Sequence, residues 1–443
     1  MREFSTGDIR SHIIHLSWPM VVANLLQNVV SAFELYLIGT IGIEALAAIA
    51  IVTSSVYALY ISVHGAVING AIAMTSRFAG AGDYDKINRS LPLMLLYSTA
   101  VFALFCGMMY IYRVPVLSFF GAKGNVLLMA EEYISILALS FLPMAFYSVF
   151  IGVFRGAGDS VTPLRMITVM VIVNAVLNPV FIIVLKMGLK GAALANLCAF
   201  TAAALGYTAL IFKGVHFFKF RAPDFNADRK LFSRYSLISN KAIGQNFAAD
   251  VGIIALLKIM SFFGNEFLAA YGIVARLAFF IMMFGWPIGN SGGAILGQNL
   301  GIKAYERVRK TVYEGIKIFS WITVPCAAAF LLFAPQIMPV FTNEQKVIEY
   351  GVYYMRVVAP FLPLLGVGLI IQAAFNGAGS TGTPMIVNLI AYLAIRLSLA
   401  VFLIYLTPLK EYGIFWAISA TVAAYSAIYW YLFKKGKWMM KEI

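Results

Sequence analysis

Apolar residues occur along this chain in long runs that are separated by short polar breaks. A helix that crosses a lipid bilayer needs about 20 mostly apolar residues, and about twelve runs reach that length. The runs lack the strict alternation of membrane barrel strands, so they predict helices, which satisfy their backbone hydrogen bonds internally. The predicted spans are 13–39, 45–75, 89–112, 127–152, 161–185, 188–212, 236–260, 267–295, 312–337, 349–374, 383–407 and 412–433.

Composition agrees with this pattern. The chain is 61% hydrophobic and 12% charged over 443 residues, with a mean hydropathy of +0.86, well outside the range of soluble domains. We therefore expect an all-α integral membrane protein with twelve transmembrane helices, surrounded by lipid in the plasma membrane. The polar start MREFSTGDIRSHIIH lacks the apolar core and cleavage site of a signal peptide, so the first span should be retained.

The net charge of +14 is explained by topology, and no nucleic acid partner is expected. Basic residues gather in alternate loops, which predicts that those loops and both termini face the cytoplasm. These segments are Arg77 with Lys86 and Arg89, Arg155 with Arg165, residues 213–235, KAYERVRK and the tail KKGKWMMK. The three cysteines, Cys106, Cys198 and Cys326, lie in apolar runs without metal-ligand spacing, so no metal site or other cofactor is predicted.

The chain contains an internal duplication. VFRGAGDSVTP at 153–163 returns as AFNGAGSTGTP at 374–384, 221 residues later, and GIEALAA at 42–48 returns as GNEFLAA at 264–270. Six helices are repeated, and because six is even, the copies enter the membrane in the same direction, as a parallel repeat. We expect two pseudo-symmetric six-helix bundles, 1–212 and 236–443, joined by a cytoplasmic linker, 213–235.

Each GAG…TP motif is a turn between two spans, in which glycines reverse the chain and proline starts the next helix. The duplication carries more information about function. Two similar bundles that face each other form a cleft at the membrane midplane that opens to either side, and this is the architecture of a secondary transporter.

The order of the motifs carries a resemblance. These are WP in the first helix, then GIEALAA, RGAGDSVTP, NAVLNP, GAALA, LGQNLG and NGAGSTGTP. In this order, over nearly the whole chain, they resemble the MATE family of multidrug and toxic compound extruders. The resemblance implies a twelve-helix, two-lobed antiporter without enzymatic activity. It would export small organic, often cationic or amphiphilic, compounds by alternating access, driven by protons or sodium ions, and we expect a monomer.

A polar stripe runs along the first predicted helix. At about 100° per residue, Asn24, Gln27, Asn28, Ser31 and Glu34 share one face. An unpaired carboxyl or amide group in lipid costs several kcal/mol, in order-of-magnitude terms. We therefore expect this face to look into the bundle or the cleft.

Further amides lie in the fifth and sixth helices. Asn174 and Asn178 are four residues apart, Pro179 frees a carbonyl group one turn earlier, and Asn196 lies within GAALANL. In the family that the chain resembles, the first lobe holds a coupling site built from acids in helices one and five, an asparagine and a hydroxyl residue. The corresponding candidates here are Glu34, Gln27, Asn24, Asn174, Asn178 and Asn196.

This set departs from the family pattern, because Asn178 replaces an acid, Asn196 replaces the hydroxyl residue and Glu34 replaces the usual aspartate. A single carboxylate weakens the binding of a hard cation such as sodium, whereas it can still carry a proton between two environments. Proton coupling is therefore favoured over sodium coupling. In the alternative interpretation, Glu34 only locks helices together through its amide neighbours.

The second lobe has charged residues of its own. Asp250 and Asn246 share a face of the seventh helix, and Lys241, Arg276 and Arg396 also lie in apolar runs. Asp250 is a candidate for a second coupling or substrate site, and an ion pair with one of the basic residues is an equal alternative. In the first lobe, His64 is either part of a proton relay or an interior residue whose hydrogen bonds are satisfied, and the second interpretation is favoured.

An apolar substrate cavity has four candidate residues, with ordinary helix packing as the equal alternative: Met260, Met282, Met283 and Trp286.

A membrane enzyme is set aside because HExxH, GxSxG and paired acid-rich motifs are missing from the sequence, and no catalytic residue is proposed. A flippase for lipids or lipid-linked oligosaccharides remains the main rival function, because Lys241, Arg276 and Arg396 could hold a pyrophosphate. A channel is a further alternative.

Overall fold

The computed structural model describes residues 4–214 and 225–440. It is 90% helical, and the described residues contain no strand. Twelve of the helices in these residues are long and apolar enough to cross a membrane. The expected all-α class with twelve transmembrane helices is therefore confirmed. Residues 215–224, which form the middle of the predicted linker, lie outside the described residues, and α8 begins at Phe225.

The chain divides into two compact units. Unit 1 contains Trp18–Ser239, and unit 2 contains Phe4–Ser17 together with the described part of Asn240–Ile443. The first turns of α1 and the later part of α8 therefore belong to unit 2.

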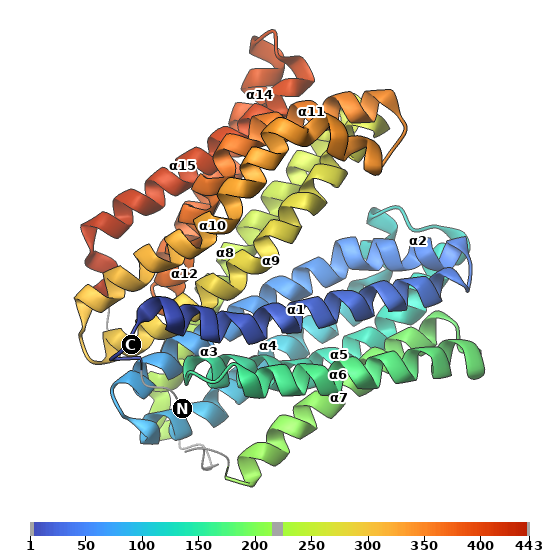
Figure 1. Ribbon diagram of the computed structural model, residues 1–443. Coiled ribbons are helices and arrows are strands. Elements are labelled where there is room, and N and C mark those ends of the chain that lie inside the picture. The colour runs from blue at the N-terminus through green and yellow to red at the C-terminus, as the bar shows by residue number, and fades with distance from the viewer. Residues whose placement is uncertain (1–3, 215–224, 441–443) are drawn as a thin grey trace. The chain divides into compact units, whose positions relative to one another are not determined.

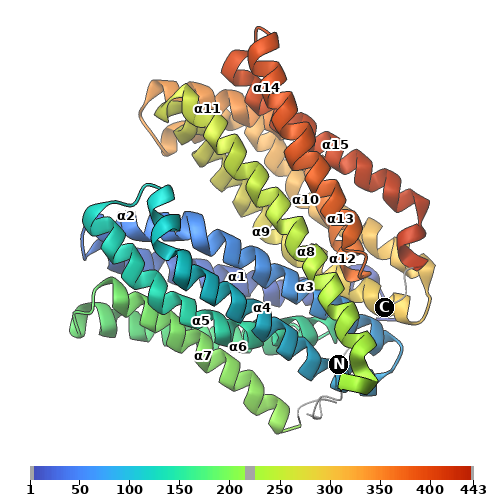
Figure 2. The same ribbon diagram turned by 180° about the vertical axis from the view of Figure 1, so that it is seen from behind.

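Unit 1 is assembled around α5, which packs against α2, α3, α4, α6 and α7. In both views the helices of this unit lie side by side (Figures 1 and 2). Most of the residues at the C-terminal end of α5 are buried, because small and aromatic side chains there fill the space between its neighbours. The helical elements of this unit are α1 (Ile9–Gly39), α2 (Ile43–Val52), η1 (Thr53–Tyr57), α3 (Ala58–Gly80), α4 (Tyr84–Phe119), α5 (Gly124–Gly156), α6 (Val161–Pro179), η2 (Val180–Val184), α7 (Leu189–Phe212) and the start of α8 (Phe225–Met260).

Unit 2 is built around α9 and α12. Helix α9 packs against α10, α11 and α12. Helix α12 also packs against α10 and α15. Its helical elements after α8 are η3 (Ser261–Phe263), α9 (Asn265–Gly301), α10 (Tyr305–Ile337), η4 (Met338–Val340), α11 (Gln345–Val358), η5 (Ala359–Phe361), α12 (Leu362–Gly377), α13 (Gly382–Asn388), η6 (Leu389–Ile395), α14 (Arg396–Leu406), η7 (Lys410–Tyr412), α15 (Gly413–Lys435) and η8 (Lys437–Met440).

The two copies of the GAG motif have the same local structure. Gly158 and Gly379 adopt positive φ angles of 88° and 70°, so they form the expected turns. Gly156 and Gly377 do not turn the chain, because they are the last residues of α5 and α12. A Cβ atom on Gly156 would lie 2.9 Å from the carbonyl oxygen of Ile72, so this glycine serves close helix packing.

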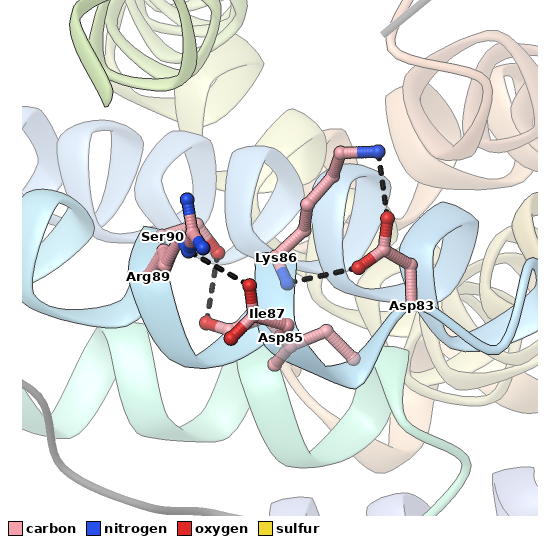
Figure 3. A network of polar contacts seen from close by, with 6 residues as sticks. All are labelled: Asp83, Asp85, Lys86, Ile87, Arg89 and Ser90. Atoms are coloured by element: carbon pink, nitrogen blue, oxygen red, sulfur yellow. Dashed lines mark hydrogen bonds and ion pairs between the residues drawn. The ribbon is translucent and has the colours of Figure 1, made fainter. Parts of the chain in front are cut away.

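The connection between α3 and α4 is a capped helix start (Figure 3). A carboxylate oxygen of Asp83 accepts the backbone N–H of Lys86 at 3.1 Å, and the Lys86 ammonium lies 2.6 Å from the other oxygen. Arg89 and Asp85 form a second ion pair at 2.8 Å. Partial burial opposes ionisation of Asp83, but the hydrogen bonds and charge of Lys86 outweigh it, so the pKa of Asp83 lies below its usual value.

Candidate functional site

Unit 1 contains a cavity of about 270 Å³ between α1, α2, η1, α5 and α7. Its wall is formed by one carboxyl group, one amide group, several hydroxyl groups, and aliphatic or aromatic side chains. The lining residues are Ser31, Glu34, Leu35, Ile38, Ile49, Val52, Thr53, Tyr57, Tyr133, Leu137, Asn196 and Phe200. Among these lining residues Glu34 is the one carboxylic acid, so it is the group whose charge changes most readily in this cavity.

A chain of three amides leads from the cavity into the interior of the unit. Asn196 donates from Nδ2 to Oε1 of Glu34 at 2.8 Å, and its Oδ1 accepts from Nδ2 of Asn174 at 2.9 Å. Asn174 in turn accepts from Nδ2 of Asn178 at 2.6 Å. Asn174 and Asn178 are 5% and 0% exposed. The structure therefore brings together four of the predicted residues from α1, α6 and α7.

The direction of these hydrogen bonds is fixed at one end. Nδ2 of Asn196 also donates to the carbonyl oxygen of Ala192 at 3.2 Å, one turn earlier on α7. A carbonyl group and a carboxylate both accept, so Asn196 must present its NH₂ group to them and its oxygen to Asn174. Each amide then donates toward Glu34. Donors aligned in this way stabilise negative charge on that carboxylate.

Local helix irregularities border the site. Pro179 cannot donate a backbone hydrogen bond, and the chain after it widens into the π-helical segment η2. A second π-helical segment, η1, forms part of the cavity wall. There the hydroxyl group of Thr53 bonds to the carbonyl oxygen of Ile49 at 2.7 Å, which competes with regular helix bonding.

The other polar residues predicted on α1 have contacts of their own. Gln27 donates from Nε2 to the hydroxyl group of Tyr147 at 3.5 Å. The backbone carbonyl of Asn24 accepts from Nδ2 of Asn28 at 2.8 Å, and the Asn28 side chain is exposed. Along the polar stripe, Glu34 therefore bonds to the amide chain, Gln27 to Tyr147, and Asn28 to the backbone of Asn24.

The candidate residues of unit 2 have different surroundings. Asp250 and Asn246 are half-buried on α8, and Arg276 is exposed on α9. The guanidinium group of Arg396, 8% exposed, lies 4.4 Å from the ring centre of Tyr392. Such stacking stabilises a buried cation in part.

The side chain of Lys241 packs beside Gly382, where an added Cβ atom would approach it to 3.2 Å. The predicted apolar residues also differ in exposure. Met260, Met282 and Met283 are buried within unit 2, whereas Trp286 is 44% exposed and contacts the ring of Phe279.

Tyr57, Tyr133 and Thr53 line the cavity, although the sequence pattern did not single them out. A tyrosine in an apolar helix is a usable signal, because its hydroxyl group needs a polar partner. The structure also gives His64 a partner, since its Nδ1 lies 2.6 Å from Oγ of Ser148.

Comparison with known proteins gives a consistent match. The sequence profile of the family described as MatE matches residues 19–180 and 243–402. Probable multidrug resistance protein YpnP of Bacillus subtilis is 24% identical over 406 residues, which cover 89% of this chain and 88% of that protein. Multidrug export protein MepA of Staphylococcus aureus is 21% identical, covering 85% and 84% of the two chains. A crystal structure of MATE in the bent conformation, 21% identical, superposes with a TM-score of 0.91 over 98% of this chain and 96% of that one.

Proposed function

The chain belongs to the MatE family, the multidrug and toxic compound extrusion transporters, and we propose that it exports small organic compounds in exchange for protons that bind to Glu34. A role in multidrug transport is supported by relatives whose names describe multidrug resistance or export. The resemblance also favours cationic or amphiphilic substrates and a location in the plasma membrane, with both termini in the cytoplasm. In this topology Glu34, near the end of α1, lies in the outer half of its span.

The observation that carries the proposal is the position of Glu34 at the end of the amide chain, in a cavity inside unit 1. An acid within a membrane-spanning helix is costly and is functional by default. This carboxyl group has one amide donor that stabilises its charged form, and a cavity large enough for several water molecules. It can therefore exist in both protonation states.

The same residues favour a proton over a sodium ion. A hard cation is held by several oxygen ligands, of which charged carboxylates contribute most of the attraction. Here the groups linked to Glu34 are neutral amides, and each of the three points an N–H group along the chain toward it. N–H donors repel a cation, whereas they assist a carboxylate that exchanges a proton with water.

The coupling follows from the different needs of the two protonation states. An ionised Glu34 requires water or hydrogen-bond donors, so it favours an arrangement in which the cavity stays hydrated. A protonated Glu34 tolerates apolar contact with residues such as Leu35 and Val52, so it favours closure of the cavity. Because α1 and η1 both form walls of this cavity, protonation shifts the population between two packings of these helices. Substrate is released outward as the proton enters.

The proposal is tested in proteoliposomes that export a cationic fluorescent dye under an imposed pH gradient. The intact protein should move dye when the gradient is present and stop when an ionophore collapses it. Glu34→Gln keeps the size and hydrogen-bonding capacity of the side chain but removes the exchangeable proton. We expect this variant to bind dye and to lose gradient-driven transport. Retention of full gradient-driven transport would rule out Glu34 as the coupling group.

Two further arms separate the alternatives. An imposed sodium gradient, with the pH held equal, should give no transport by the intact protein, and transport under this condition would select sodium coupling. Asp250→Asn tests the second lobe in the same assay. A flippase would instead move a labelled lipid-linked sugar across the vesicle membrane without moving the dye.

A further inference from the structure

A column of ring side chains runs through unit 1, away from the Glu34 cavity. The ring centres of Tyr57 and Tyr60 are 5.4 Å apart, and those of Tyr60 and His64 are 5.8 Å apart. His64 is 5.9 Å from Tyr147 and nearly parallel to it, and Tyr147 is 6.2 Å from Tyr207. Every member of this column carries a polar atom, so it is unlike an ordinary apolar core.

The two ends of the column have distinct surroundings. Tyr57 lines the same cavity as Glu34 and lies within electrostatic range of its carboxyl group. At the other end, Tyr207 and Tyr147 lie within electrostatic range of Arg155, in the last turn of α5. The column therefore connects the candidate coupling site to a buried cation near the end of the span that the charge pattern assigns to the cytoplasm.

Several polar atoms along the column have no hydrogen-bond partner in the described protein. They are the hydroxyl oxygens of Tyr60 and Tyr207 and Nε of Arg155, all buried. Buried groups of this kind are normally satisfied by internal water. His64 itself is half-buried, between Tyr60 and Tyr147. Water and tyrosine hydroxyl groups together can form the hydrogen-bonded path that proton movement requires.

Hydrogen bonding defines which nitrogen of His64 is free. The hydroxyl group of Ser148 donates its one hydrogen to the carbonyl oxygen of Met144 at 2.6 Å. The Ser148 oxygen must then accept from Nδ1–H of His64, 2.6 Å away. Neutral His64 therefore carries its hydrogen on Nδ1, and the lone pair on Nε2 is available to bind a proton.

We propose that His64 carries protons between the Glu34 cavity and the Arg155 end of unit 1. This inference rests on the proposed function, in which Glu34 takes up a proton from outside. The protonated carboxyl group of Glu34 releases H⁺ through water and becomes a carboxylate. Neutral His64 accepts that H⁺ on Nε2 and becomes an imidazolium ion. It then releases one H⁺ from Nε2 to water on the Arg155 side, which restores the neutral ring.

The groups around His64 are compatible with this role. Tyr60 on its own helix and Tyr147 on α5 flank the ring, and Arg155, also on α5, lies within electrostatic range. Helix α4 contributes Phe102, which contacts Tyr60 and has no charge. Tyr60, Tyr147 and Ser148 are neutral, and the positive charge of Arg155 opposes a lasting imidazolium ion, so a proton that binds Nε2 is passed on rather than held. Ser148 is a positioning residue, because it holds the ring through Nδ1.

The test compares His64→Phe and His64→Gln with the intact protein in vesicles that report proton flux and dye export together. Phenylalanine keeps a stacked ring between Tyr60 and Tyr147, and glutamine can still donate to Ser148, but neither residue carries a proton at neutral pH. We expect both variants to bind dye as the intact protein does and to lose proton flux and coupled export by about tenfold or more. His15→Phe is the matched control, because His15 is exposed and lies outside the column.

Three outcomes overturn the proposal. Proton flux that is unchanged in His64→Phe shows that His64 is not in the path. Loss of dye binding in both variants shows that the His64 side chain is needed for the folded, substrate-binding state. If His64→Gln keeps proton flux and coupled export while His64→Phe loses them, transport needs the hydrogen bond to Ser148, and His64 does not carry the proton. Glu34→Gln is measured in parallel: if it keeps coupled export, the proposed function fails, whereas failure at His64 alone leaves that function intact.

Discussion

Replacing Asn178 by aspartate tests the direction of the amide chain. Asn178 is fully buried and donates from Nδ2 to Oδ1 of Asn174 at 2.6 Å. An ionised aspartate has no donor, so two oxygen atoms would face each other at this contact. Asn174 cannot rotate to relieve the conflict, because its own NH₂ group donates to Asn196, which is fixed by Glu34 and the Ala192 carbonyl.

The size of the effect follows from these contacts. Asn178→Leu has a similar volume, and it removes the donor without adding charge, so it leaves the Asn174 oxygen unsatisfied at a cost of about 1–3 kcal/mol. Asn178→Asp adds a buried carboxylate that lacks a partner, which raises the cost to about 3–5 kcal/mol. We therefore expect the free energy of unfolding to decrease in the order intact protein, Asn178→Leu, Asn178→Asp.

The assay is thermal unfolding of the purified protein in detergent at neutral pH, followed with a thiol-reactive fluorophore. Sodium chloride and choline chloride should stabilise the intact protein equally, because the amides linked to its Glu34 carboxylate present N–H donors rather than oxygen ligands. A protonated aspartate could still donate to Asn174, so stability is followed as the pH is raised. If Asn178→Asp is as stable as the intact protein in choline chloride and loses no stability at higher pH, the hydrogen bonds of the amide chain do not run toward Glu34. Greater stabilisation of the intact protein by sodium than by choline would contradict proton coupling.

Two further predictions concern helix ends and helix contacts. Asp83→Ala removes the cap of α4 and should destabilise the protein by about 0.5–2 kcal/mol. Because the pKa of Asp83 is lowered in the folded state, its contribution is complete above the unfolded pKa of about 3.9 and is lost as the pH falls through the lower folded value. The difference between Asp83→Ala and the intact protein, measured by unfolding at a series of pH values, should therefore shrink in acid, and a difference that grows in acid would contradict this sign. Gly377→Ala places a Cβ atom 2.5 Å from the carbonyl oxygen of Gly293 and should cost about 1–3 kcal/mol. Gly107→Ala in α4, where nothing lies within 4 Å, is the control and should be neutral or stabilising in the same thermal assay.

The twelve spans could be predicted because every helix that crosses the lipid needs about 20 mostly apolar residues. The duplication also predicted that the two GAG motifs would share a structure, as Gly158 and Gly379 do. The role of Gly156 and Gly377 was not predictable from the motif, because close approach of another helix depends on packing partners far away in sequence. Helix ends also differed: the predicted span 45–75 is divided into α2, η1 and α3, and α3 continues to Gly80.

The contacts of Glu34 could be predicted in part. Spacing placed Asn174 and Asn178 on one face, and an acid in an apolar helix requires polar partners, so a contact between these elements was a reasonable expectation. Spacing could not identify Tyr57 as a neighbour of Glu34. The π-helical segment η1 inserts an extra residue per turn, so a regular helical period assigns the wrong face beyond Thr53.

The most direct measurement of the central claim is proton release when substrate binds. A substrate dye is added to the purified protein in weakly buffered detergent solution, and the change in proton concentration is recorded with the intact protein and with Glu34→Gln. If substrate and proton compete through Glu34, binding to the intact protein should release up to one proton per dye molecule, and binding to Glu34→Gln should release none. Equal proton release by both proteins, at equal dye occupancy, would contradict the account.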